Sequence, residues 1–134
     1  MSEQSDFPLP EITPLTEPYW KALSEGRLTF QRCGSCGAAW LPARAECARC
    51  LGDELGWETA SGRGRLVSWV VYHHAFHKAF AQRLPYNVAI VELEEGPRLI
   101  TNIVNPQAGL AVDRPVQLVI EQEHGVALAR FRVV

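Results

Sequence analysis

The second half of the chain alternates apolar and polar residues with a period of two, which is the pattern of half-buried β-strands. Between residues 115 and 123, for example, Val116, Leu118 and Ile120 fall on one face. Turn signals separate five segments with this pattern, namely Arg65–His74, Tyr86–Leu93, Arg98–Val104, Pro115–Glu123 and Val126–Val133. The sequence therefore predicts five strands in this half.

The connections between these segments indicate how the strands pair. Short turns at Glu94–Pro97 and Glu123–Gly125 predict two hairpins, and longer loops follow the first and third strands. Five strands with this spacing favour a small Greek-key barrel of the OB type, with a β-sandwich as the open alternative. The expected fold is thus mainly β.

The segment before Gly26 predicts a short helix over Glu17–Glu25, because Thr16 can cap its start, a proline follows in the first turn and the glycine ends it. Before it, three prolines in Ser2–Thr16 favour an extended arm. Large apolar residues share one face of the helix and either pack on the rest of the protein or dock a partner: Tyr19, Trp20 and Leu23.

Two short strands are expected between the helix and the barrel, at Leu28–Gln31 and Trp40–Pro42. We assign no strand to the glycine-rich stretch that follows, residues 51–64, and place the domain junction in it near Ser61. We therefore divide the chain into an N-terminal arm and helix (1–27), a metal ribbon (28–60) and a barrel domain (61–134).

All four cysteines of the chain lie in two Cys-x2-Cys pairs that are ten residues apart: Cys33, Cys36, Cys47 and Cys50. Two residues between ligands allow a tight turn to direct both thiolates at one point, and two such turns complete a tetrahedron. We expect a structural Zn²⁺ site, because four protein ligands leave no open position for catalysis. Buried thiols, two disulfides or an iron site as in rubredoxin are the alternatives; a Cys-Ala-Arg-Cys second pair favours zinc over iron.

Composition narrows the classes of function without choosing one. The net charge is -2, divided as -4 over residues 1–60 and +2 over residues 61–134, so no strong nucleic-acid footprint is present. No apolar run is long enough to cross a bilayer and no secretory signal begins the chain, so we expect a cytoplasmic protein without a membrane span. A reducing compartment also favours metal-bound cysteines over disulfides.

The remaining motifs indicate a functional site less clearly than the four cysteines do. His73, His74 and His77 lack the glutamate of a His-Glu-x-x-His site, and no nucleophile and base pattern can be picked out, so no catalytic residue is assigned. The loop over residues 75–85 combines aromatic and cationic side chains that can contact a ligand at the barrel mouth: Phe76, Lys78, Phe80 and Arg83.

Several longer motifs resemble a known family. They are Tyr19-Trp-Lys-Ala-Leu-Ser-Glu-Gly-Arg-Leu28, Gln31-Arg-Cys-Gly-Ser-Cys-Gly37, Leu84-Pro-Tyr-Asn-Val-Ala-Ile-Val-Glu-Leu-Glu-Glu-Gly96, Pro97-Arg-Leu-Ile-Thr-Asn102 and Arg130-Phe-Arg132. In order and spacing they resemble the acyl-CoA-associated family once named domain of unknown function thirty-five. Two departures are the prolines of the N-terminal arm, which disfavour a first helix found in longer members, and Asp113-Arg-Pro115, where a glycine is expected before the strand.

The resemblance implies a short N-terminal helix, a rubredoxin-like zinc ribbon with the four cysteines as ligands, and a five-stranded OB-fold. It further implies a non-catalytic accessory or scaffold subunit of a thiolase-like or acyl-CoA hydratase-like enzyme, hence a hetero-oligomer, with acyl-CoA as a possible ligand. A single-stranded nucleic-acid-binding module is the alternative, because zinc ribbons and OB-folds serve that role elsewhere.

Overall fold

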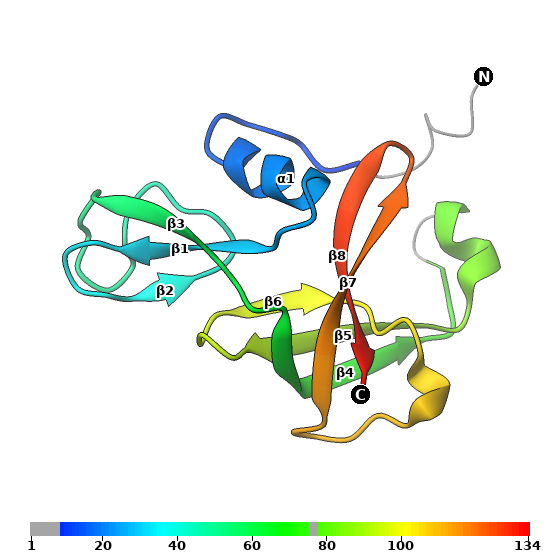
Figure 1. The fold of residues 1–134 in the computed structure, drawn as a ribbon. Coiled ribbons are helices and arrows are strands. Elements are labelled where there is room, and N and C mark those ends of the chain that lie inside the picture. Colours follow the sequence, from blue (N-terminus) through cyan, green and yellow to red (C-terminus); the bar gives the residue numbers. More distant parts are fainter. Residues whose placement is uncertain (1–8, 76–77) are drawn as a thin grey trace.

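The structure is a computed structural model that describes residues 9–75 and 78–134 and is mainly β (Figure 1). Its elements in chain order are α1 (Glu17–Ser24), β1 (Thr29–Cys33), β2 (Ala39–Trp40), β3 (Leu55–Thr59), β4 (Arg63–Tyr72), the 3₁₀ helix η2 (Lys78–Arg83), β5 (Tyr86–Leu93), β6 (Arg98–Thr101), the 3₁₀ helix η3 (Pro106–Ala108), β7 (Pro115–Glu123) and β8 (Val126–Val133). The strands form a three-stranded antiparallel ribbon, β2-β1-β3, and a five-stranded antiparallel sheet, β6-β5-β4-β7-β8.

The five-stranded sheet curls into a nearly closed barrel, which confirms the predicted OB-like architecture. Beyond the end of β6, Ile103 forms a parallel bridge to Phe131 of β8. Two backbone hydrogen bonds support this bridge, from Val104 N to Phe131 O (2.8 Å) and from Phe131 N to Asn102 O (3.1 Å). The first and last edges of the sheet therefore meet, and little strand edge is left open there.

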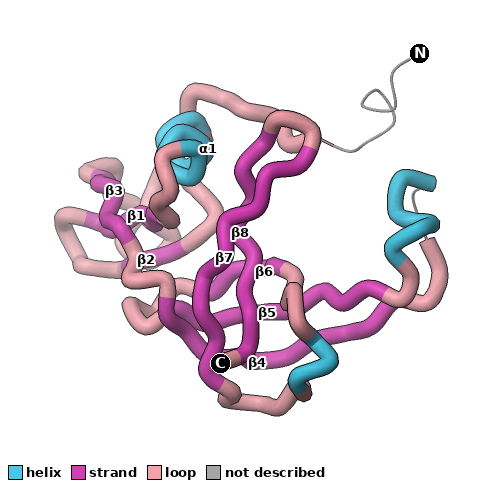
Figure 2. Tube along the Cα trace, turned by 45° about the vertical axis from the view of Figure 1, so that its right-hand side comes forward, coloured by secondary structure: helices cyan, strands magenta, loops and turns pink. Residues whose placement is uncertain are grey.

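One hydrophobic core connects the helix, the ribbon and the barrel. Leu23 of α1 and Phe30 of β1 are no more than 1% exposed and belong to the same buried cluster as Leu66, Val91 and Phe131 of the barrel. Helix α1 lies between the ribbon and the β7–β8 hairpin and contacts both β1 and β8 (Figures 1 and 2). The helix, the ribbon and the barrel therefore share one core. The division into 1–27, 28–60 and 61–134 stays a prediction.

The structure differs from the sequence prediction mainly at strand ends and at one missed strand. Strand β3 occupies part of the stretch to which no strand was assigned from the sequence. It forms because backbone pairing with all five residues of β1 stabilises it in spite of Gly56. Strand β6 ends at Thr101, three residues earlier than expected, where the chain turns towards β8. Asp113 has a φ of 67°, the left-handed conformation that explains the glycine expected at this turn.

Candidate metal centre and surface grooves

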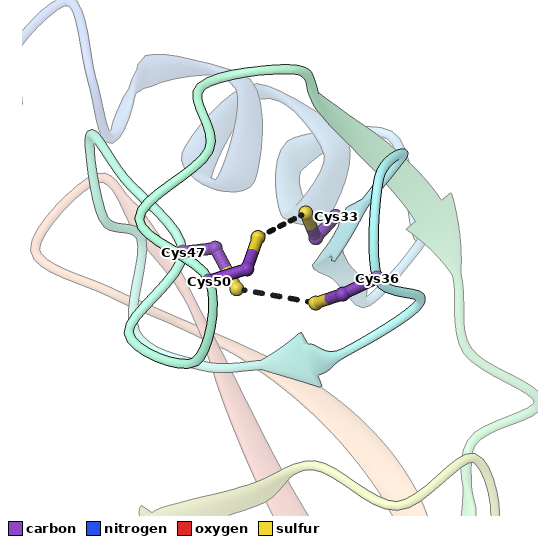
Figure 3. Close-up of side chains that lie close together, drawn as sticks. All are labelled: Cys33, Cys36, Cys47 and Cys50. Carbon is purple, nitrogen blue, oxygen red and sulfur yellow. Dashed lines mark hydrogen bonds between the residues drawn. The ribbon is translucent and has the colours of Figure 1, made fainter.

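The four cysteine side chains converge on one point at the end of the ribbon (Figure 3). The sulfur atoms of Cys33 and Cys50 are 3.5 Å apart, as are those of Cys36 and Cys47, and all four sulfur atoms lie within 4.8 Å of one another. Among the residues that the structure describes, this is the one group of three or more potential metal ligands that are close enough to share an ion.

Two similar turns position the cysteines. In the first, Gly37 N donates to Cys33 O (3.0 Å), and in the second, Leu51 N donates to Cys47 O (2.8 Å). The residue after each turn is left-handed, with a φ of 78° at Gly37 and 64° at Leu51. Only the first turn therefore has the glycine that this conformation favours.

A buried glutamine holds the connection between the two turns. Gln31 of β1 is 3% exposed, and its Oε1 accepts hydrogen bonds from Trp40 Nε1 (2.7 Å) and from Arg44 N (2.7 Å). These bonds fix the chain that leads from β2 to the second cysteine pair. Hydrogen bonds within the ribbon thus help to position the second cysteine pair.

The hydrogen bonds and crowding of the thiols separate their pKa values. The backbone N–H of Cys36 hydrogen-bonds the Cys33 sulfur and lowers the pKa of that thiol to about 6. Burial raises the pKa of Cys47, but the N–H groups of Cys50 and Arg49 more than offset this and lower it overall. The N–H of Gly52 lowers the pKa of Cys50, but the neighbouring thiols and burial raise it to about 12. Four thiolates at these distances repel one another, so full ionisation requires a cation between them.

The geometry fits zinc. A Zn–S bond of about 2.3 Å in a regular tetrahedron gives sulfur–sulfur distances of about 3.8 Å, close to the 3.5 Å separations of the two cysteine pairs. Backbone N–H groups already donate to the sulfur atoms, from Arg49 N to Cys47 Sγ and from Gly52 N to Cys50 Sγ (both 3.4 Å). Zinc bound by four thiolates would hold the ribbon together, with no site left for a substrate.

The apolar face of α1 serves mainly the core, and part of it remains at the surface. Leu23 is 1% exposed, so it packs inside and is not available for docking. Tyr19 and Trp20 are half-buried, with their rings 5.1 Å apart in an edge-to-face arrangement. They line an apolar groove of about 300 Å³, which we call the helix groove, together with Thr16, Leu41, Pro42, Ala43, Leu99 and Ile100.

The predicted ligand-contacting loop is only partly described. Phe76 lies outside the described residues, as does the side chain of Phe80, so their contacts stay predictions. Lys78 is exposed at the start of η2. Arg83 is half-buried at the end of η2, where its Nη2 lies 2.6 Å from Oε1 of Glu123 in β7.

Arg83 lines a second groove of about 690 Å³ on the outer face of the barrel, which we call the barrel groove. Sequence reasoning missed its other charged residues, Glu121, Glu123 and Arg130, although they occupy outward positions of the two strongly alternating final strands. The register of the β7–β8 hairpin could have indicated them, because it places Glu121 opposite Leu128 and Glu123 opposite Val126.

Among the residues that the structure describes, the remaining candidates form no second cluster of metal ligands. His73 and His74 are exposed, and His77 lies outside the described residues. No helix within residues 9–75 and 78–134 has the length and apolar character needed to span a lipid bilayer.

Comparisons with known proteins agree with the two-part architecture. A family model described as "ChsH2, rubredoxin-like zinc ribbon domain" matches residues 20–56, and one described as "ChsH2, C-terminal OB-fold domain" matches residues 57–121. Among solved structures, the "Ltp2-ChsH2(DUF35) aldolase" is similar over 93% of this chain and 98% of that chain, with 33% sequence identity and a TM-score of 0.82. A DUF35-family protein of unknown function from Sulfolobus solfataricus shares the fold at 16% identity, with a TM-score of 0.68 over 90% of this chain and 86% of that chain.

Curated relatives extend the comparison to longer proteins. A "Probable enoyl-CoA hydratase alpha subunit" from Thermomonospora curvata is 38% identical over 109 residues, which cover 80% of this chain and 32% of that protein. A "DUF35 domain-containing scaffold protein" from Methanocaldococcus jannaschii is 39% identical over 88 residues, which cover 64% of this chain and 62% of that protein. The chain thus spans about a third of the first and less than two thirds of the second.

Proposed function

Since the chain belongs to the DUF35 family of zinc-ribbon and OB-fold proteins, we propose that it is a non-catalytic accessory subunit of a thiolase-like enzyme that acts on acyl-CoA substrates. The observation that carries the proposal is its similarity, over nearly the whole length, to the DUF35 chain of the Ltp2-ChsH2 aldolase. Three relatives are named scaffold proteins, which favours a non-catalytic role over a catalytic one. A hydratase-like partner is the alternative, supported by the Thermomonospora curvata relative.

In this proposal Cys33, Cys36, Cys47 and Cys50 hold one structural Zn²⁺. The metal supplies no chemistry to a substrate, because four thiolates fill its coordination sphere. Its contribution is to fix the two turns and the ribbon strands, and through the shared core to hold α1 at a defined place beside the barrel.

The helix groove is the proposed docking site for the partner enzyme. Its lining is almost wholly apolar, and Ile100, which lines it, is 75% exposed, the highest value among the exposed large hydrophobic residues that the structure describes. The groove also combines three parts of the chain, α1 with Trp20, the ribbon with Pro42 and the barrel with Ile100. A partner that inserts an apolar side chain here would contact all three, and an aromatic-lined pocket is typical of such anchor points.

The test is co-purification with the thiolase-like enzyme encoded by the same organism. We expect the zinc-loaded chain to bind this enzyme, and Ile100→Glu to weaken binding at least tenfold, because a buried unpaired carboxylate at an interface is costly. Val112→Glu is the matched control, since Val112 is 64% exposed and does not line the groove. Absence of any acyl-CoA enzyme bound to the wild-type chain would overturn the proposed function, and equal binding by both variants would overturn only the docking site.

A further inference from the structure

The barrel groove has the size and the mixed lining of a small-molecule binding site. Its volume of about 690 Å³ lies within the usual range for small-molecule sites, about 300–1,000 Å³. Apolar side chains from β5, the segment after β6 and β8 make up much of its lining: Val88, Val104, Val126 and Leu128. Because these residues lie outside the buried core cluster, a ligand could cover them without displacing core side chains.

One side of the barrel groove carries four charged groups that neutralise one another. Arg83 pairs with Glu123 (2.6 Å), Arg130 pairs with Glu121 (2.7 Å), and Arg130 also pairs with Glu123. The side chains of Arg130 and Glu123 are only 16% and 19% exposed, so these pairs are poorly screened by water. The described residues that line the groove therefore contribute a net charge of zero.

The ion pairs keep both signs of charge present. Burial by itself raises the pKa of Glu123, but hydrogen bonds from Arg130 and Arg83 more than offset burial and leave the pKa below its ordinary value. Glu123 is thus ionised near neutral pH, and Arg83 is already engaged. A phosphate or carboxylate entering the groove would bring a further negative charge close to Glu121 and Glu123, whose arginine partners are already neutralised, so repulsion and lost hydration oppose its binding.

An uncharged polar group meets no such obstacle. The two ion pairs of Arg130 use its Nη1 and Nη2 atoms, one N–H each, and a guanidinium carries five N–H donors, so an amide or ester can be bound without breaking a pair. The apolar lining beside these donors suits an aliphatic segment. We propose that the barrel groove binds an uncharged amphipathic small molecule, an aliphatic chain that carries an amide or ester group.

This inference concerns the chain by itself and does not depend on the partner proposed above. It also changes the role expected for Arg83, which shapes the groove by holding η2 to β7 through Glu123 rather than binding a phosphate. The two proposals can fail separately, because the helix groove and the barrel groove have no lining residue in common.

The test uses three ligands of equal chain length and different charge: octanamide, octanoate and octylammonium. Each is titrated into the full-length, zinc-loaded chain labelled with ¹⁵N, and the amide shifts of Val88, Val126 and Leu128 report on the barrel groove. We expect octanamide to bind about tenfold tighter than either ion, because each ion gives up hydration to enter a groove whose charged groups already neutralise one another.

Two variants separate groove binding from weak adsorption. Glu123→Gln leaves a net positive charge on Arg83 and Arg130, so octanoate affinity should rise about tenfold relative to octanamide affinity. Val104→Trp should block all three ligands, because Val104 lines the groove and is 38% exposed, which leaves the core intact. Val112→Trp, outside the groove, is the control for the added ring.

Several results would overturn the inference. Tighter binding of octanoate than octanamide to the unaltered chain would make the arginines an anion site. Insensitivity to Val104→Trp would place the ligand elsewhere. Absence of groove shifts with all three ligands, together with protection of the same amides in a complex with another protein, would make the groove a protein-docking surface. An unfolded Glu123→Gln variant would leave the ligand comparison and Val104→Trp as the deciding measurements.

Discussion

The side chain of Asn87 replaces a strand partner where the barrel closes. Asn87 of β5 is 7% exposed, and its Oδ1 accepts a hydrogen bond from Ile103 N (2.7 Å) while its Nδ2 donates to Ile103 O (2.9 Å). Ile103 itself is 2% exposed and comes just after β6 has ended. One amide side chain thus satisfies both backbone groups of a buried residue that has left the pairing with β5.

Asn87→Leu should destabilise the barrel through these two groups. Leucine has a similar volume but neither donor nor acceptor, so Ile103 N and Ile103 O lose their partners. An orphaned buried polar group costs about 1–3 kcal/mol, so two cost about 2–6 kcal/mol. The added apolar burial returns about 1–2 kcal/mol, which leaves a net loss of about 0–5 kcal/mol, with a middle value of about 2.5 kcal/mol. For a domain with a total stability of about 5–15 kcal/mol this is a large change.

Urea unfolding of the zinc-loaded chain, followed by tryptophan fluorescence, measures this loss, and hydrogen exchange at Ile103 locates it. Asn102→Ala is the matched control, because Asn102 is half-buried and makes one side-chain hydrogen bond, from Nδ2 to Asn87 O (2.5 Å). We expect the control to lose about 1 kcal/mol. If Asn87→Leu loses no more than the control and the Ile103 amide stays protected, the side chain does not close the barrel as argued.

Three further changes test the ribbon and the ion pairs. Cys47→Ser should lower bound zinc from one equivalent to less than 0.2, measured by mass spectrometry of the metal, and loosen the ribbon first; retention of zinc and of partner binding would contradict its assignment as a ligand. Leu51→Gly should raise the unfolding free energy by about 0.5–1 kcal/mol, because it removes a left-handed leucine from the second cysteine turn, whereas Leu51→Ala should give no gain. Glu123 has a lowered pKa in the folded chain, so its ion pairs stabilise the protein above about pH 4.5 and this contribution is lost as the pH falls towards the folded pKa. Glu123→Gln should therefore give a shallower loss of stability below about pH 4.5 in acid titrations monitored by circular dichroism, and an unchanged acid profile would refute the coupling.

Much of the barrel could be predicted because its signals are local. The alternation over β7 and β8 gave the bounds Pro115–Glu123 and Val126–Val133 that the structure has, since each strand has one buried face and tight turn residues at its end. The zinc ribbon could be expected for the same reason, because a pair of Cys-x2-Cys turns encodes its own geometry. The family resemblance is confirmed as well.

The missed features depend on contacts between distant segments. Strand β3 has a weak pattern of its own and forms because β1 provides a complete pairing edge. The same holds for the closing contacts of Asn87 and for the ion pair between Arg83 and Glu123, which joins η2 to β7 across 40 residues. A sequence pattern specifies which face of a strand is buried, but it does not specify which distant residue will supply the missing partner.

The shared core has a consequence for how the protein responds to metal supply. Phe30, three residues before the first cysteine, is buried against the same cluster as Phe131 near the end of the chain. Zinc held by the ribbon therefore stabilises the barrel too, by about 1.4 kcal/mol for each tenfold rise in free zinc above the dissociation constant. The fraction of folded chain should therefore follow the free zinc concentration, and zinc removal should unfold the barrel as well as the ribbon.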